Sequence, residues 1–173
     1  MQSKSIILRA LEPTDLDFLY KWENDSSLWH LSNSNTPFSR FVLEQFILNA
    51  HLDIYTNKQL RLMIDLISTP INITIGCIDI FDFDPINKRA GVGILIADEY
   101  RNKGFAADSM KLLIKYGFDN LQLHQLYCNI SEDNIASLKL FERHGFEIIG
   151  LKKDWNLRNE NWIHEYSLQL IKK

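Results

Sequence analysis

Residues 91–118 constrain the fold more than any other part of the chain. They begin with an aliphatic run typical of a strand, continue through a short basic loop with one glycine, and end with helical spacing of apolar residues. The N-terminus of a helix attracts anions through its free amides and its dipole. Gly104 allows close backbone approach, and Arg101 and Lys103 add positive charge. The passage predicts a strand-loop-helix unit able to bind an anion, although on this pattern alone an ordinary junction is the better explanation.

The rest of the chain predicts one mixed α+β domain over residues 1–173, not a doubly wound sheet. The expected strands are residues 6–11, 60–67, 73–83, 90–97, 126–130, 146–151 and 162–170. One helix is expected to begin at Thr14, and three more are expected at residues 41–52, 106–118 and 133–144. The polar stretch 24–39 is expected to be an irregular or short-helical connection.

Composition narrows the class of protein. The chain has 173 residues, 46% of them hydrophobic, which fits one globular domain with a substantial core. Its net charge of −3 argues against general binding to nucleic acid or anionic membranes. The apolar runs are too short to span a bilayer, and the N-terminal segment does not resemble a secretory signal, so we expect a cytoplasmic protein. Cys77 and Cys128 lie in apolar runs and are expected to be buried free thiols, not a disulfide or a metal site.

Two short motifs are RNKGFA at residues 101–106 and NIASLKLFERHGF at residues 134–146. The first resembles the Arg/Gln-x-x-Gly-x-Gly/Ala signature of the GNAT superfamily of N-acetyltransferases, and the second resembles its Asn-x-x-Ala/Ser-x-x-x-Tyr-x-x-x-Gly-Phe motif. The resemblance covers nearly the whole chain. The opening residues 8–16 and the stretch 88–90 point to the branch that holds spermidine acetyltransferases and ribosomal-protein N-terminal acetyltransferases. It implies a central twisted mixed sheet of six to seven strands flanked by about four helices.

The resemblance also implies acetyl-CoA as co-substrate. The backbone of Ile94, Leu95 and Ile96 would pair with the pantetheine arm, and an amide near Leu95 would polarise the thioester carbonyl. Asn134 would reach the same arm. The residues expected to hold the pyrophosphate are Arg101, Asn102, Lys103, Gly104, Phe105 and Ala106. Where many relatives place a tyrosine as general acid, this chain has Phe141, which can line the coenzyme site but cannot donate a proton.

Transfer to an amine also requires that the amine lose a proton, which costs about 4–5 kcal/mol at pH 7 for a lysine-like group. Asp79 is our candidate to take that proton or bind the amine; the alternative is a carboxylate on an exposed strand face. Asp82 and Asp84 are expected to face solvent. Tyr127 or a water is a candidate to protonate the leaving thiolate, although we favour a packed core or edge tyrosine at Tyr127. A thiol of pKa near 8.5 can also leave without an acid.

Acids and aromatic residues in the expected acceptor region suit a cationic amine. They are Trp22, Glu23, Asp25, Trp29, His30, Phe38, Asp79, Asp154 and Trp155. Trp22 and Trp29 fit equally well as hydrophobic anchors. Asn33 and Asn35 stand where polyamine-acetylating relatives carry an acidic pair, which argues against a regulatory polyamine site. The five histidines are expected to have surface or structural roles.

Three functions remain open at this point. The chain could acetylate a polyamine or a similar small cationic amine, it could acetylate a protein N-terminus or an aminoglycoside, or it could bind acetyl-CoA as a sensor with little catalysis. The resemblance is also compatible with a homo-oligomer. In that case we expect the strand 162–170 to be a sheet edge that pairs across subunits.

Overall fold

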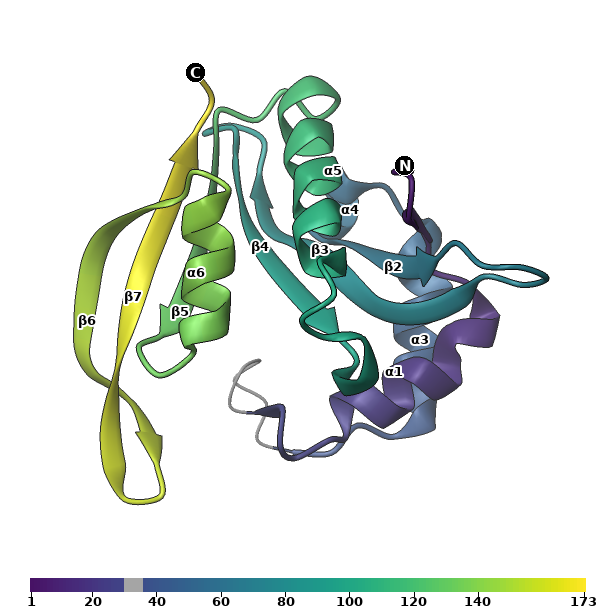
Figure 1. The fold of residues 1–173 in the computed structure, drawn as a ribbon, viewed down its shortest axis with the longest axis horizontal. Coiled ribbons are helices and arrows are strands. Elements are labelled where there is room, and N and C mark those ends of the chain that lie inside the picture. Colours follow the sequence, from purple (N-terminus) through teal and green to yellow (C-terminus); the bar gives the residue numbers. More distant parts are fainter. Residues whose placement is uncertain (30–35) are drawn as a thin grey trace.

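Seven strands form one mixed sheet in the order β1-β2-β3-β4-β5-β7-β6, in a computed structural model that describes residues 1–29 and 36–173 (Figure 1). The strands are β1 (Ile6–Ala10), β2 (Leu60–Leu66), β3 (Ile73–Asp84), β4 (Arg89–Ile96), β5 (Gln125–Ser131), β6 (Glu147–Arg158) and β7 (Asn161–Ile171). The described α-helices are α1 (Leu16–Glu23), α3 (Arg40–Leu48), α4 (Ile54–Asn57), α5 (Phe105–Asp119) and α6 (Ile135–Arg143). β4 and β5 run parallel, and the other neighbouring pairs are antiparallel. The predicted α+β class and mixed sheet are confirmed.

Helices cover both faces of the sheet because its central strands are apolar on both sides. On β3, Ile78 belongs to a buried cluster with Met110 of α5 and Phe141 of α6. Its neighbour Cys77 belongs to a second cluster with Leu19 of α1 and Leu43 of α3. Successive strand residues point to opposite faces, so α5 and α6 lie on one face and α1 and α3 on the other (Figure 1). We call these the α5 face and the α1 face.

The predicted elements agree with the structure except in two places. The short helix α4 was not predicted; Asp53 caps it by accepting hydrogen bonds from the amides of Tyr55 and Thr56. The strand predicted to end at Leu151 continues to Arg158 and forms a long hairpin with β7 that projects from the sheet (Figure 1).

The predicted sheet edge was wrong. β7 pairs with β5 on one side and with β6 on the other, so the C-terminal strand lies inside the sheet and β6 forms the edge. The reason is that the last hairpin folds β6 outside β7, and chain order does not reveal this. β6 is strongly exposed and carries large apolar side chains, including Ile149, Trp155 and Leu157.

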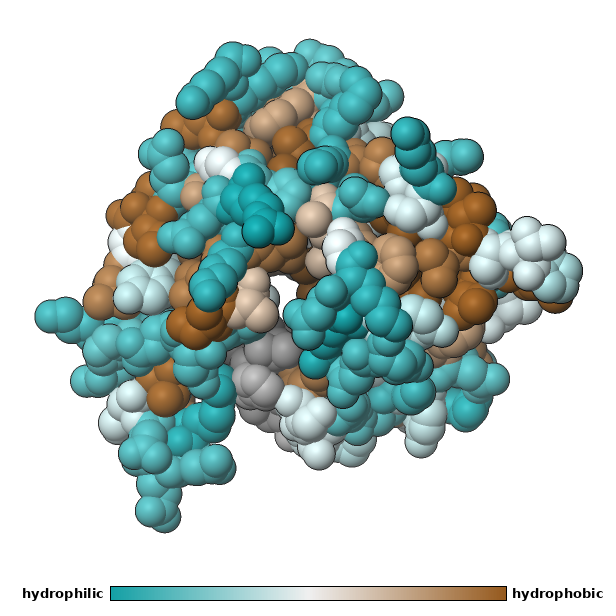
Figure 2. Space-filling model, in the orientation of Figure 1, coloured by the Kyte–Doolittle hydropathy of each residue, from teal (hydrophilic) through white to brown (hydrophobic). Residues whose placement is uncertain are grey.

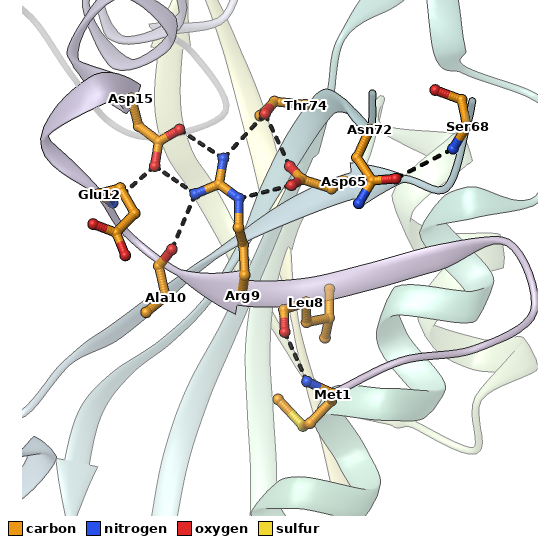
Figure 3. Close-up of polar contacts among 10 residues, drawn as sticks. All are labelled: Met1, Leu8, Arg9, Ala10, Glu12, Asp15, Asp65, Ser68, Asn72 and Thr74. Atoms are coloured by element: carbon orange, nitrogen blue, oxygen red, sulfur yellow. Dashed lines mark hydrogen bonds and ion pairs between the residues drawn. The ribbon is translucent and has the colours of Figure 1, made fainter. Parts of the chain in front are cut away.

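A closed network around Arg9 fastens β1 to its neighbours on the α1 face (Figure 3). The guanidinium donates two hydrogen bonds of 2.7 Å to Asp15 and one of 2.7 Å from Nε to Asp65. It also donates to the Ala10 carbonyl and the Thr74 hydroxyl, each at 3.1 Å. Asp15 precedes α1 and is almost fully buried. The network therefore fixes the start of α1 against β1, β2 and β3.

Both cysteines are buried free thiols, as predicted, and burial raises the pKa of Cys77 and Cys128 to about 12. His144 has the predicted structural role, because its ring nitrogens contact the carbonyls of Leu140 and Ala107 and so link α6 to α5. Across the described residues, every helix is too short or too polar to cross a membrane.

Candidate functional site

β4 and β5 separate soon after they meet. Residues 89–91 of β4 pair with 125–127 of β5, and beyond them β4 stays paired with β3 while β5 stays paired with β7. The two strands then diverge, and the space-filling view shows the molecule hollowed near its centre in this region (Figure 2). We call the opening the β4–β5 gap. It leaves backbone groups of β4 without a neighbouring strand, which suits an extended ligand.

The direction of these backbone groups can be followed along β4. The amide of Ala97 donates to a β3 carbonyl at 2.8 Å, and alternation in an antiparallel pair means that Leu95 also faces β3. The amides of Ile94 and Ile96 therefore point into the gap. The Ile96 carbonyl accepts a 2.9 Å hydrogen bond from Arg101 Nε. The Leu95 amide itself points away from the gap, so the amides near Leu95 that face the gap are those of Ile94 and Ile96.

The loop before α5 presents a row of backbone amides. The amides of residues 102–106 donate to no acceptor within the described parts of the chain. Asn102 and Gly104 have positive φ angles of 60° and 88°. A Cβ at Gly104 would meet no atom within 4 Å, so the positive φ, not crowding, is what favours glycine. Gly104 caps α5, and Phe105 and Ala106 form its first turn. The loop thus has the geometry of an anion site.

The two basic side chains of the loop fold back onto the chain before it. Arg101 pairs with Asp98 at 2.9 Å as well as bonding the end of β4. Lys103 donates to the Glu99 carbonyl at 2.8 Å and lies over the Tyr100 ring. Arg101 therefore ties the loop to the rim of the gap in this structure, while its charge adds to the positive potential of the α5 N-terminus.

Asn134 and Phe141 come from α6, on the β5 side of the gap. Asn134 caps α6 by accepting a 3.2 Å hydrogen bond from the Ser137 amide through Oδ1. Its Nδ2 has no acceptor among the described residues, so that group is free for a ligand. Phe141 is buried in the core, edge-on to Phe146 at 4.9 Å between ring centroids.

On the α1 face, Asp79 belongs to an ion-pair cluster around Arg61 that the sequence did not reveal. Arg61 on β2 donates from Nε and Nη2 to the two Asp79 oxygens, at 2.8 and 3.0 Å. Its Nη1 donates to Glu23, the last residue of α1. Burial disfavours the charged form of Arg61, but the attraction of Asp79 and Glu23 outweighs it and holds the pKa of Arg61 well above its usual value. We call these three residues the Arg61 cluster.

The cluster lies beside the gap. Asp79 pairs directly with Gly93 of β4, and among the described atoms a Cβ at Gly93 would have only the Phe81 ring, at 3.7 Å, within 4 Å. Phe81 covers Gly91 and packs edge-on against Tyr127. A shallow floor at Gly93 is therefore bordered by a charged cluster on one side and by aromatic rings on the other.

Tyr127 stands at the last residue pair before the strands diverge. Its hydroxyl donates to Asp82 at 3.3 Å. Burial, followed by the nearby charge of Asp82, raises the pKa of Tyr127. Asp82 is exposed, as predicted, whereas Asp84 is half-buried and pairs with Arg89 at 3.2 Å.

Of the remaining candidates, Asp25 is exposed and accepts from Ser27, and Phe38 packs against the core on the α1 face. The others fall into three groups. Trp22 is a buried anchor on α1, and Trp29 donates through its indole N–H to the Glu23 carbonyl at 2.8 Å. Asp154 and Trp155 lie on the exposed hairpin. His30, Asn33 and Asn35 lie outside the described residues.

Comparison with known proteins supports the resemblance. A family model described as an acetyltransferase (GNAT) domain matches residues 5–147. Spermidine N(1)-acetyltransferase of Escherichia coli K12 is 26% identical over 146 residues, covering 84% of this chain and 75% of its own. A crystal structure of spermidine N-acetyltransferase from Vibrio cholerae with CoA and spermine has a TM-score of 0.87 at 24% identity, covering 98% of this chain and 96% of that one.

A dodecameric structure of the Vibrio cholerae protein has a TM-score of 0.80 at 26% identity, covering 98% of this chain and 95% of that one. The family match spans most of the chain, and the seven-stranded fold agrees with it. The chain therefore belongs to the GNAT family of N-acetyltransferases, enzymes that use acetyl-CoA as co-substrate.

Proposed function

We propose that this chain transfers the acetyl group of acetyl-CoA directly to a primary amine of a small cationic acceptor, such as a polyamine. The β4–β5 gap carries the proposal, because it joins two complementary sites. Free amides and a helix N-terminus at residues 102–106 suit the anionic end of a coenzyme. Carboxylates and an aromatic ring around Gly93 suit a cation.

The residues present fit coenzyme A. The amides from Asn102 to Ala106 would bind the pyrophosphate, and Arg101 would hold the loop in place. The backbone of Ile94 and the amide of Ile96 would bind the pantetheine amides, with Asn134 Nδ2 as a further donor from α6. Acetyl-CoA supplies an acetyl group already activated as a thioester. The chain then has to hold that group at the gap and prepare the amine.

Preparation of the amine is assigned to Asp79, directly or through a water. Arg61 occupies one hydrogen-bonding site on each Asp79 oxygen, and each oxygen can accept a further bond. Moving the proton of a lysine-like ammonium to water at pH 7 costs about 4–5 kcal/mol. A fixed carboxylate that accepts this proton beside the nitrogen lowers that cost.

No side-chain acid is proposed for the departing sulfur. Phe141 has no proton to give, and the Tyr127 hydroxyl donates to Asp82. A thiol of pKa near 8.5 leaves as a thiolate that solvent can protonate. We therefore propose that Tyr127 packs against Phe81 and keeps the two strands together at the point where the gap begins.

Thiol release from acetyl-CoA by the purified protein tests the proposal. The acceptors would be spermidine, spermine, a peptide beginning with alanine or serine, and an aminoglycoside. We expect saturable release with the polyamines and formation of one acetylated amine per thiol. Turnover of the peptide or the aminoglycoside alone would replace the acceptor class. Coenzyme binding without turnover of any amine would identify a sensor.

Two further properties are part of the proposal. We place the protein in the cytoplasm, in agreement with its two free thiols. We also propose a homo-oligomer that pairs through the exposed β6 edge, by analogy with the dodecameric relative. Sedimentation equilibrium should show a species heavier than the 20.3 kDa chain. A monomer at all protein concentrations would contradict the proposed homo-oligomer.

A further inference from the structure

The Arg61 cluster contains an imbalance of charge that no role in coenzyme binding explains. Two carboxylates, from Glu23 and Asp79, share one guanidinium, so their formal charges sum to −1. All three side chains are largely but not completely buried, with 15–21% of each side chain exposed. Screening by solvent is weaker there than at a fully exposed site, so a change of one charge in the cluster has a larger effect on its interaction with a nearby charged ligand.

Among the residues that the structure describes, the hydrogen bonds of the cluster are incomplete, which leaves it capacity for a ligand. Arg61 uses three of its five N–H donors within the described residues. Glu23 accepts from Arg61 through Oε1, and its Oε2 accepts nothing from those residues. The Glu23 side chain keeps 21% of its surface exposed. A cation could therefore approach Glu23 without displacing Arg61.

Packing holds the guanidinium in its place. The ring of Phe46 on α3 lies 5.2 Å from its central carbon, and two bonds to Asp79 fix its plane. The Arg61–Asp79 pair spans directly opposite residues of β2 and β3, and Gly93 follows next across the sheet. The charge of Arg61 is therefore set at a constant position relative to the floor of the gap.

We propose that Arg61 is a specificity-determining residue that limits the negative charge facing the acceptor amine to −1. This inference rests on the proposed function, because it assumes that the amine approaches Gly93 from the α1 face. One ammonium group would be bound by Glu23 and Asp79 together. Loss of Arg61 would leave two neighbouring carboxylates, which favour more highly charged amines over less charged ones.

Four proteins test the charge count: the wild type, Arg61→Met, Glu23→Gln, and the double variant. Their clusters carry formal charges of −1, −2, 0 and −1. Calorimetry on the CoA-saturated proteins would give Kd for 1,4-diaminobutane and for spermine. We expect the ratio of the two constants, diamine over spermine, to rise about tenfold in Arg61→Met and to fall about tenfold in Glu23→Gln. In the double variant it should return to within about twofold of the wild type.

Restoration in the double variant separates charge from structural damage, because a purely structural role of Arg61 would leave the double variant at least as impaired as the single one. Arg40→Met is the matched control, since it removes one positive charge from an exposed pair on α3 and should leave the ratio unchanged. If Arg61→Met does not fold, Glu23→Gln still tests whether the charge of the cluster sets the ratio of the two dissociation constants.

An unchanged ratio in Glu23→Gln or Arg61→Met, or failure of the double variant to restore it, would overturn the inference. The binding ratio does not require turnover, so it can be measured even if the wild type acetylates no amine. If no amine is acetylated but the binding ratios follow the charge of the cluster, only the proposed function is rejected. If an amine is acetylated but the ratios do not follow that charge, only the role of Arg61 is rejected.

Discussion

Two arginines on the α1 face hold the two ends of the same helix. Arg9 on β1 binds Asp15, which precedes α1, and Arg61 on β2 binds Glu23, the last residue of α1. All five N–H donors of Arg9 are in hydrogen bonds, whereas Arg61 uses three within the described residues. Asp15 is almost fully buried, and Glu23 is partly exposed.

The difference teaches how to separate a structural ion pair from a functional one. A network whose guanidinium donors are all used specifies one arrangement and has no donor left for a ligand. A network with unused groups beside a gap can bind one. The Arg9 network therefore maintains the sheet and α1, and the Arg61 cluster is the one that we propose binds the acceptor amine.

Arg9→Met should produce the largest loss of stability. The substitution leaves the buried Asp15 carboxylate without its partner, so we expect the free energy of unfolding to fall by about 3–5 kcal/mol. Urea unfolding measures this. Arg40→Met, which breaks an exposed pair with Asp17, should cost at most about 1 kcal/mol. If both substitutions lower the free energy of unfolding by the same amount, the Arg9 network does not stabilise the fold more than an exposed ion pair does.

Asp79→Asn should have the largest effect on turnover. An amide cannot take the amine proton, so kcat at pH 7 should fall about 100-fold. The deficit should shrink as the pH approaches the pKa of the amine, because the free base then exists without help. Initial rates from pH 7 to 10 provide the measurement. A variant with unchanged turnover and an unchanged pH profile would make Asp79 a structural partner of Arg61, like Asp15 of Arg9.

Phe141→Tyr should change turnover little, by less than about threefold, if the thiolate leaves without an acid. Rates at saturating substrates are the test, with urea unfolding as control because Phe141 is buried against Phe146. A rise of about 10²-fold would show that the missing hydroxyl limits the enzyme.

Tyr127→Phe should have the smallest effect. The Tyr127 hydroxyl donates to Asp82, and burial raises the pKa of Tyr127, which favours its protonated form. We expect kcat to stay within about twofold of the wild type from pH 7 to 10. A pH-dependent loss of 10²-fold or more would instead assign Tyr127 as the acid.

The sequence predicted what depends on local pattern. Aliphatic runs located the strands, and the turn at Gly104 with its basic neighbours located the α5 loop, because these signals lie within a few residues of each other. The edge strand was misplaced because the position of β6 outside β7 depends on pairing between distant segments.

The acceptor side of the site was less accessible to sequence reasoning. Arg61 and Asp79 are 18 residues apart and meet only through the β2–β3 register, and Glu23 joins them only through the packing of α1. An arginine directly opposite a carboxylate in a predicted antiparallel pair is a signal that could have located the cluster. The direction of the Leu95 amide likewise follows from the β3–β4 register, which the sequence does not specify.

The central claim is that the coenzyme binds where β4 and β5 diverge, and hydrogen exchange tests it most directly. The amides of residues 102–106, and those of Ile94 and Ile96, have no intramolecular acceptor in the described structure and should exchange rapidly in the free protein. Saturating CoA should slow exchange in peptides covering 92–96 and 101–107, with no comparable change around Arg9. Binding of CoA that leaves both segments unprotected would contradict the account.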